Sequence, residues 1–383
     1  MMKLRRILFV QYSDPALYPP LEHSSGIFVE RGWAVVFLGT GTALNHNLHL
    51  PSSPGVRVER IQLAQEGWKQ KSQYVVFIVW ILWWTYWWRP NWIYASDPLC
   101  TPALWFVRKL TKIHIVYHEH DSPSFTQAQS WFMKTVFKYR NKLGRVAELC
   151  VLPQQMRLVE FLRATRRSGP AFCVWNCPRL DEILDSNSSQ ERKLIIYYHG
   201  SINGSRLPAQ LIIAACRFNG AVQLRVAGYE PPGSVGHMRE LIALSAKMGV
   251  PDLIDFVGTI PLRRDLLHIA LGAHVGLSFM PKESEDINMQ HMVGASNKPF
   301  DCMACGLPLL VTDLPEWVST FVEPGYARAC EPCDPDSIEM ELRWYLDHPD
   351  DRREMGRRCR DKIRQDWNYD TMFADVLASV ENG

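Results

Sequence analysis

The residues best suited to chemistry lie together at 295–313, in the run Ala-Ser-Asn-Lys-Pro-Phe-Asp-Cys-Met-Ala-Cys-Gly-Leu-Pro-Leu-Leu-Val-Thr-Asp. The pattern predicts a short helix that Asn297 or Lys298 caps and Gly306 ends, followed by a buried strand. Free N–H groups at a helix start attract anions, and Lys298 would add a cation beside them. Asp301 lies further along the helix, where a carboxylate can accept hydrogen bonds from ribose or sugar hydroxyls. The segment therefore indicates a nucleotide-sugar site.

A second loop can contact the same phosphates. The stretch 198–206 follows a predicted strand, and Gly200 lets the backbone approach a phosphate closely. Arg206 offers a fork of hydrogen-bond donors, although a plain surface turn is the alternative. A leaving diphosphate carries about two negative charges, which Arg206 and Lys298 together can neutralise. We therefore expect no metal and no cofactor, only a nucleotide diphosphate sugar as co-substrate, and we interpret 334–336 (Asp-Pro-Asp) as a turn.

The amino-terminal half contains a run of titratable residues, Tyr-His-Glu-His-Asp at 117–121, where a predicted strand ends. Strand alternation puts His118 and His120 on one face, with Glu119 and Asp121 on the other. Near neutral pH a histidine can stabilise a developing oxyanion or orient an acceptor hydroxyl. His120 is the first catalytic candidate and His118 the second. A structural histidine bonded to a neighbouring loop is the alternative for both.

The motif at 297–308 resembles that of glycosyltransferase family 4, which runs roughly Asn-Lys-x-Phe-Glu-x-Met-Ala-x-Gly-x-Pro. This chain has Asp301 in place of the family's glutamate, and Val293 where the family commonly has a further glutamate. The resemblance implies an α/β GT-B fold, with two Rossmann-like domains whose parallel sheets face each other across a cleft. It also implies a retaining, hexosyltransferase-like enzyme that moves a sugar from a nucleotide diphosphate donor to an acceptor hydroxyl.

The same resemblance assigns expected roles. His120 would face the donor sugar, and the leaving phosphate itself would take the acceptor's proton. Gly258 and Thr259 would lie where backbone groups read the nucleobase, and Glu316 would line the ribose pocket unless it belongs to a solvated turn. The remaining donor contacts would come from Gly200, Arg206, Ser296, Asn297, Lys298 and Asp301.

Two other functions fit the same resemblance. A GT-B sugar-nucleotide epimerase would share the phosphate site but would interconvert the donor without an acceptor. A non-catalytic GT-B partner subunit would be compatible with Val293 and Asp301, and it need not bind nucleotide diphosphates at all. The base, the sugar and the acceptor are not specified by the sequence, although a lipid-linked or cell-surface glycan precursor is one expectation for the acceptor.

Length and hydrophobic periodicity indicate two domains in these 383 residues. Alternating strands and helices predict parallel β-α-β sheets. Expected strands lie at 7–10, 34–38, 92–94, 113–117 and 149–152, and then at 194–199, 224–227, 254–257, 275–279 and 309–311. We expect an acceptor-side domain at 1–180, a polar linker at 181–193 and a donor domain at 194–366, with the segment from about 367 to 383 returning to the first domain.

The net charge and the cysteine content indicate which partners and which cellular compartment to expect. A net charge of +2 gives no reason to expect nucleic acid as a partner. The apolar run at the start is too short for a signal peptide, so the ten cysteines are expected to be thiols in a reducing cytoplasm. The Cys-x-x-Cys pairs at 302/305 and 330/333 have zinc-like spacing, but neither is interpreted as a set of zinc ligands, and the thiols of the first pair can be small buried side chains in the motif helix.

The stretch 74–88 is the most unusual, because Thr85 is its only residue outside the apolar set. Five tryptophans follow helical spacing, and we expect them on one side of a helix, partly exposed near the rim of the cleft: Trp80, Trp83, Trp84, Trp87 and Trp88. The run is shorter than the ~20 residues that span a bilayer. It is either buried against the sheet or contacts a membrane or a lipid acceptor, which would place the enzyme peripherally at the inner face of the membrane.

Overall fold

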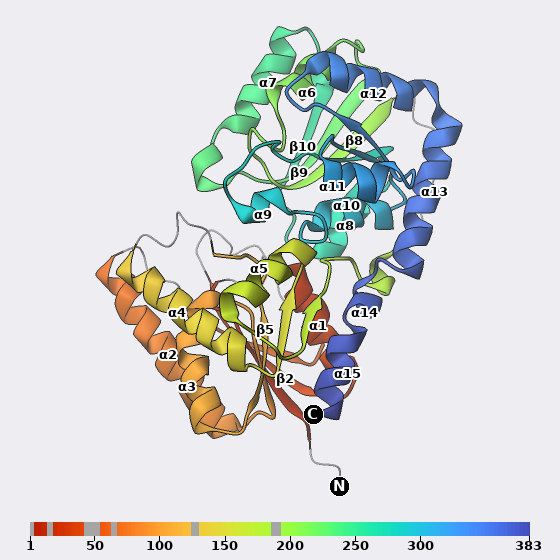
Figure 1. Ribbon diagram of the computed structural model, residues 1–383. Helices are drawn as coiled ribbons and strands as arrows, with labels where there is room; N and C mark the ends of the chain where they lie inside the picture. The colour runs from red at the N-terminus through yellow and green to blue at the C-terminus, as the bar shows by residue number, and fades with distance from the viewer. Residues whose placement is uncertain (1–3, 14–17, 42–53, 63–66, 124–129, 185–192) are drawn as a thin grey trace. The chain divides into compact units, whose positions relative to one another are not determined.

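The computed structural model describes residues 4–13, 18–41, 54–62, 67–123, 130–184 and 193–383. The chain forms two compact units (Figure 1). The first contains Met1–Asn176, Asp286–Ala295 and Tyr369–Gly383, and the second contains Cys177–Glu285 and Ser296–Asn368. The predicted division at 1–180 and 194–366 stays a prediction, and it differs from these units in the place of 286–295. Most of the predicted linker, 185–192, lies outside the described residues.

The first unit is built on a seven-stranded sheet of order β3-β2-β1-β4-β5-β6-β7, in which every pairing is parallel. The strands are β1 (Arg6–Val10), β2 (Ala34–Gly41), β3 (Val56–Gln62), β4 (Trp92–Ala95), β5 (His114–His118), β6 (Leu149–Leu152) and β7 (Ala171–Cys173). Five of them were predicted. The edge strands β3 and β7 were missed, because each is partly exposed and lacks the continuous apolar run of a strand buried on both faces.

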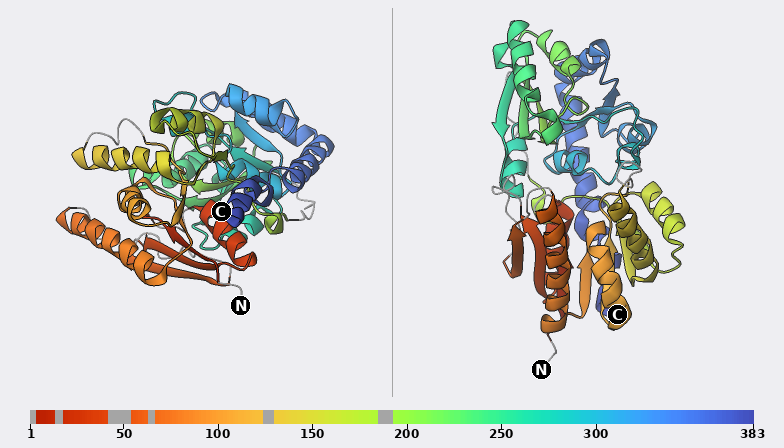
Figure 2. Two further views of the ribbon diagram at one scale, coloured as in Figure 1. Left: turned by 60° about the horizontal axis from the view of Figure 1, so that its bottom comes forward. Right: turned by 90° about the vertical axis from the view of Figure 1, so that its left-hand side faces the viewer.

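Helices cover both faces of this sheet (Figure 2). One face packs against α1 (Pro19–Glu30), α14 (Tyr369–Met372) and α15 (Ala374–Asn382), through a core that includes Phe28, Phe373 and Val376. The other packs against α2 (Trp68–Trp88), α3 (Thr101–Leu110), α4 (Trp131–Val146) and α5 (Gln155–Thr165). The last helices of the chain therefore pack in the first unit, as does α9 (Ile287–Gln290).

The second unit contains a six-stranded parallel sheet of order β10-β9-β8-β11-β12-β13. Its strands are β8 (Leu194–Ser201), β9 (Val222–Tyr229), β10 (Ile254–Gly258), β11 (Val275–Ser278), β12 (Leu309–Thr312) and β13 (Ala327–Cys330). All but β13 were predicted. Its helices are α6 (Ala209–Cys216), α7 (His237–Lys247), α8 (Arg263–Ala270), α10 (Asn297–Ala304), α11 (Pro315–Trp317), α12 (Pro335–Asp347) and α13 (Pro349–Gln365). The order reverses between β8 and β11, which is where open α/β sheets bind ligands.

Three further observations bear on the sequence predictions. Short 3₁₀ turns occur at Pro98–Cys100, Leu180–Glu182, Pro232–Ser234 and Pro251–Leu253, and a π turn at Val318–Val322. All ten cysteines are free thiols, as predicted. Among the described residues, no helix is long and apolar enough to cross a membrane.

Candidate functional site

The centre of the site is the contact between the end of β8 and the start of α10. Gly200 has a φ of +105°, a backbone conformation that other residues rarely adopt. A Cβ atom there would lie 2.8 Å from Lys298 Cε and 3.2 Å from Lys298 Nζ. The glycine therefore allows the Lys298 ammonium to lie directly against the backbone at the reversal point of the sheet. The fold thus brings together Gly200 and Lys298, which lie in separate segments of the sequence.

The start of α10 differs from the prediction. Ser296 is the N-cap, with φ −86° and ψ 126°, so the expectation that Asn297 or Lys298 caps the helix is wrong. Neither residue can be the cap, because both already lie within the helix. The helix end is as predicted, since Gly306 follows the C-cap with a φ of +73°.

The electrostatics of Lys298 are those of a cation that lacks a close counter-ion. Within the described ranges, its Nζ takes part in no hydrogen bond or ion pair. Burial, and then the nearby Arg206, lower the pKa of Lys298 to about 7, although Asp301 acts in the opposite direction. A bound anion would restore the stability of the charged form.

Arg206 is the second cation. Its side chain is buried, with Nη1 donating to the carbonyl of Phe279 at 3.0 Å and also contacting Met280 Sδ. Burial lowers the pKa of Arg206, which nonetheless remains a cation because guanidinium groups do not lose their proton in proteins. Its positive charge helps to lower the pKa of Lys298, so the two cations belong to the same part of the site.

Several buried polar atoms around the start of α10 have no hydrogen-bond partner among the described residues. They are Ser296 Oγ, Asn297 Oδ1 and His199 Nε2. The His199 nitrogen lies 3.5 Å from Asp301 Oδ2 without forming a hydrogen bond, and burial lowers the pKa of His199 to about 4. An unsatisfied buried polar group costs about 1–3 kcal/mol, so a cluster of them indicates a place that a polar ligand completes.

Asp301 is held by residues that the sequence analysis did not identify. Arg263 donates Nη2 to Asp301 Oδ1 at 2.6 Å and Nη1 to Oδ2 at 3.1 Å, while its Nε donates to Glu182 at 2.6 Å. Although burial opposes the charge, Asp301 and Glu182 raise the pKa of Arg263 well above its usual value. Both oxygens of Asp301 thus already accept from Arg263. The ribose-binding role stays a prediction, and a ribose would have to share or displace these contacts.

The other predicted donor residues lie at the same, carboxyl edge of the sheet. Gly258 ends β10 with a φ of +84°, and Thr259 Oγ1 donates to the carbonyl of Gly228 in β9 at 3.3 Å. Gly228 pairs with Gly200 in the sheet. Glu316 lies in α11, just after β12. Their individual contacts to a donor remain predictions.

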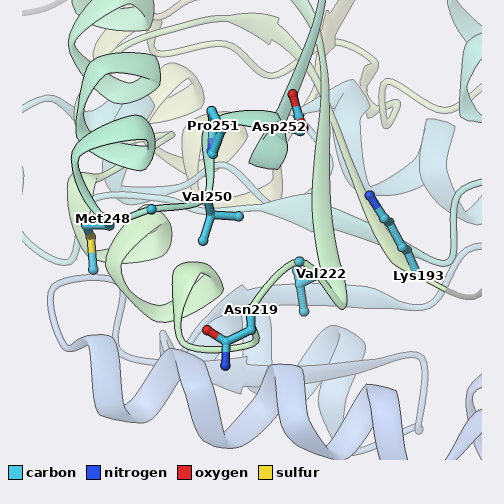
Figure 3. Close-up of a pocket in the computed structure, with 9 residues that line it drawn as sticks. Lys193, Asn219, Val222, Met248, Val250, Pro251 and Asp252 are labelled. Atoms are coloured by element: carbon cyan, nitrogen blue, oxygen red, sulfur yellow. The ribbon is translucent and has the colours of Figure 1, made fainter.

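A pocket of about 280 Å³ lies at the opposite edge of this sheet (Figure 3). Lys193 and Val222, at the starts of β8 and β9, line it together with Met248 and Pro251. None of the predicted site residues lines this pocket. It is therefore separate from the Lys298 region.

In the first unit, His118 and His120 lie on one face at the end of β5, as predicted, with ring centroids 4.0 Å apart. Tyr94 Oη lies 2.8 Å from His118 Nδ1, whereas neither ring nitrogen of His120 has a hydrogen-bond partner among the described residues. Burial lowers the pKa of His120 to about 3 and holds that of His118 well below its usual value. Both imidazoles are consequently neutral at physiological pH.

The backbone of His120 is held by Arg157 from α5. Arg157 donates to the carbonyls of His120 at 3.1 Å, Asn288 at 2.7 Å and His291 at 3.0 Å. Asn288 in turn bonds both backbone groups of Ser122 at 2.8 Å. This network explains why the segment 286–295 belongs to the first unit. The sequence offered no signal for it, because the partners are far apart along the chain.

The tryptophans do not share one environment, which corrects the expectation of a single exposed stripe. Trp84 is buried in the core of the first unit, and Trp80 and Trp88 are partly buried against it. Trp83 and Trp87 are 51% and 57% exposed and stack on each other with ring centroids 5.3 Å apart. The five tryptophans differ in exposure because the buried face of the helix is centred on Phe77, Ile81 and Trp84, and the other four tryptophans lie beside or opposite that face.

Comparisons with known proteins agree with this architecture. Residues 234–378, which include the α10 motif, match the family described as glycosyl transferase-like. The chain is similar to a sucrose-phosphate synthase from Thermosynechococcus elongatus, with 14% identity, a TM-score of 0.72, and coverage of 99% of this chain and 98% of the other. It is also similar to Alr3699/HepE from Anabaena, with 13% identity, a TM-score of 0.73, and coverage of 99% and 100%.

WaaG, a glycosyltransferase, is a third similar structure, with 13% identity, a TM-score of 0.66, and coverage of 98% of this chain and 100% of the other. No curated protein sequence matches the chain. At these identities the solved structures establish the fold alone, and the family match covers the part of the chain that carries the motif. Together they confirm the predicted GT-B fold, and they show that residues 234–378 match a glycosyl transferase-like family.

Proposed function

We propose that this protein is a retaining, family 4-like transferase that moves a hexose from a nucleotide diphosphate donor to an acceptor hydroxyl. One observation carries the proposal: the Lys298 ammonium lies against Gly200 with no close counter-ion in the described residues, where the strand order reverses. A half-buried cation without a close counter-ion in that position favours an anionic ligand.

The diphosphate would be held by three groups. Lys298 supplies an ammonium, and the first N–H groups of α10 supply donors aligned with the helix dipole. Arg206, whose Nη1 donates to the carbonyl of Phe279, adds a second positive charge. These groups act on the developing charge of the leaving diphosphate, so this assignment requires no metal ion.

A uracil nucleotide is the first donor to test. Structures of the Anabaena protein are described as complexes with UDP, with UDP and glucose, and with UDP-glucose. That protein has the same fold as this chain, and the choice of base and sugar here is a proposal.

The chemical step that fits a retaining enzyme without an obvious nucleophile is transfer on one face of the sugar. The bond from the anomeric carbon to the phosphate oxygen breaks, the bond to the acceptor oxygen forms, and the acceptor's proton passes to the leaving phosphate. The neutral His120 imidazole would orient the acceptor hydroxyl by a hydrogen bond rather than act as a cation. His118 would support it through the contact between the two rings.

The acceptor is proposed to be a lipid-linked or cell-surface glycan precursor on the cytoplasmic side of a membrane. WaaG, which shares the fold, is described as involved in lipopolysaccharide biosynthesis. An exposed apolar helix on this chain agrees with an acceptor of that kind.

Calorimetry with UDP, GDP and ADP tests the donor site directly, in buffer with and without EDTA. We expect one diphosphate to bind regardless of EDTA, and to bind weakly in Lys298→Ala. Lys282→Ala is the matched control, because Lys282 lies in the same unit but is paired with Asp313 and Glu331. If none of the diphosphates binds the native protein, or if both variants bind like the native protein, the proposed donor site is wrong.

A further inference from the structure

The outer face of α2 is apolar and uncovered. Six of its residues recur at helical spacing and are each at least 40% exposed: Val75, Val79, Leu82, Trp83, Tyr86 and Trp87. Soluble proteins rarely expose so continuous an apolar strip unless it binds something. The same helix uses Phe77, Ile81 and Trp84 for the core, so the exposed residues are not needed to hold the helix in place.

The strip continues onto the neighbouring helices. Tyr74 of α2 contacts Phe132 of α4, with ring centroids 5.1 Å apart, and the adjoining Trp131 is 81% exposed. On α3, Phe106 and Leu110 are also exposed. The helices α2, α3 and α4 lie side by side on one face of the sheet (Figure 1). We call their outer surface the α2–α4 face.

This face is also basic throughout. The three helices contain 21, 10 and 16 residues and nine lysines or arginines, but no aspartate or glutamate, in a chain that has 40 acidic residues. Two of the nine are neutralised elsewhere in the unit, since Arg140 pairs with Glu119 and Arg108 with Glu148. The exposed cations are Lys69, Lys71, Lys109, Lys134, Lys138 and Arg145.

The positive charge of the α2–α4 face favours an anionic bilayer over a second copy of this chain as its binding partner. A symmetric dimer through the α2–α4 face would bring the face against itself and oppose cations to cations, which is unfavourable. An anionic bilayer instead supplies negative headgroups to the lysines and an apolar layer to the tryptophans and aliphatic side chains. Tryptophan and tyrosine in particular favour the boundary between headgroups and acyl chains.

We propose that the α2–α4 face docks this protein onto an anionic lipid bilayer, with α2 lying in the plane of the interface. The apolar strip of α2 enters the boundary region, and the lysines around it contact the headgroups. This inference does not depend on the proposed donor site, because docking requires neither a nucleotide nor sugar transfer.

The test is co-sedimentation of the native protein with phosphatidylcholine vesicles, with and without phosphatidylglycerol. We expect binding only to the anionic vesicles, and weaker binding as salt screens the charges. Lys134→Glu/Lys138→Glu should weaken the partitioning by roughly 30-fold or more, because each cation near an anionic surface contributes about a factor of five. Trp83→Ser/Trp87→Ser should have an effect on the order of 30-fold, since it removes two half-exposed indoles from the contact.

Matched controls come from exposed residues of the second unit. Val235→Ser/Met340→Ser removes apolar side chains that are 73% and 61% exposed, and Arg239→Glu/Lys247→Glu reverses two exposed charges on α7. Both should bind vesicles like the native protein, and far-UV spectra should show all four variants folded. Native protein that stays in the supernatant with anionic vesicles would overturn the proposal. So would test variants that bind no worse than the controls, or a dimer in light scattering that Trp83→Ser/Trp87→Ser converts to monomer.

Discussion

Lys298→Ala is the most informative single change, because it removes the ammonium from the Gly200 backbone without altering a described hydrogen bond or ion pair. A charge-assisted hydrogen bond to a phosphate contributes ~1.5–3 kcal/mol. Since 1.36 kcal/mol corresponds to a factor of ten, donor affinity should fall by about 10- to 150-fold. The fold should remain intact, because alanine favours the helix in which residue 298 lies.

The same interaction predicts how donor binding depends on pH. The pKa of Lys298 is about 7 in the free protein, and a bound diphosphate must raise it. Binding should therefore take up a proton above about pH 7, and affinity should decline by up to tenfold per pH unit until the pKa of the complex is reached. The total decline should match the loss caused by Lys298→Ala, since both measure one interaction.

The assay is calorimetry with a nucleotide diphosphate sugar, whose diphosphate does not titrate in this range. The native protein, Lys298→Ala and the control Lys282→Ala are compared between about pH 6 and 9. The variant Lys298→Ala should bind weakly at every pH, with a flat profile. A native affinity that is independent of pH, combined with an unchanged affinity in Lys298→Ala, would refute the reasoning.

Four further changes test other parts of the molecule. Gly200→Ala should weaken donor binding at least tenfold, because its Cβ would lie 2.8 Å from Lys298 Cε, while Gly220→Ala, with a similarly positive φ of +87° but open space around it, should not. Asp301→Asn should lower stability by about 1–3 kcal/mol in urea unfolding, since Arg263 loses a charged acceptor; it should discriminate ribonucleotides from 2′-deoxyribonucleotides only if Asp301 also contacts the ribose. The pKa of His120 is about 3 in the folded protein and about 6.5 in the unfolded chain, so its contribution to stability is present above pH 6.5 and is lost as the pH falls toward 3. His120→Gln should remove this pH dependence of stability between pH 3 and 6.5, and it should lower kcat. Trp84→Ala should destabilise by ~3–5 kcal/mol in the same unfolding assay, whereas Trp83→Ala should have little effect.

The sequence alone determined the fold class, and it predicted where the donor site lies. Buried strands read as continuous apolar runs, and nine of the ten strands that were found are mostly buried. The tenth, β10, is an exposed edge strand that was found from its apolar residues. The missed strands β3, β7 and β13 are at sheet edges and partly exposed, so their patterns are weaker. The helix at 297–304 and the common face of His118 and His120 were also predicted from local sequence, since both follow from backbone geometry.

Only the tertiary structure decided which groups are paired. Asp301 and Glu182 both accept hydrogen bonds from Arg263, and the backbone of His120 is held by Arg157. These contacts join residues 37 to 81 positions apart, which no local pattern encodes. The pKa of Lys298 depends on burial beside Arg206, which likewise arises only on folding. The rotation of α2 is the clearest case. Apolar residues occur on all sides of this helix, so periodicity could not predict which face is buried. In the structure, Phe77, Ile81 and Trp84 pack against the sheet and define the buried face.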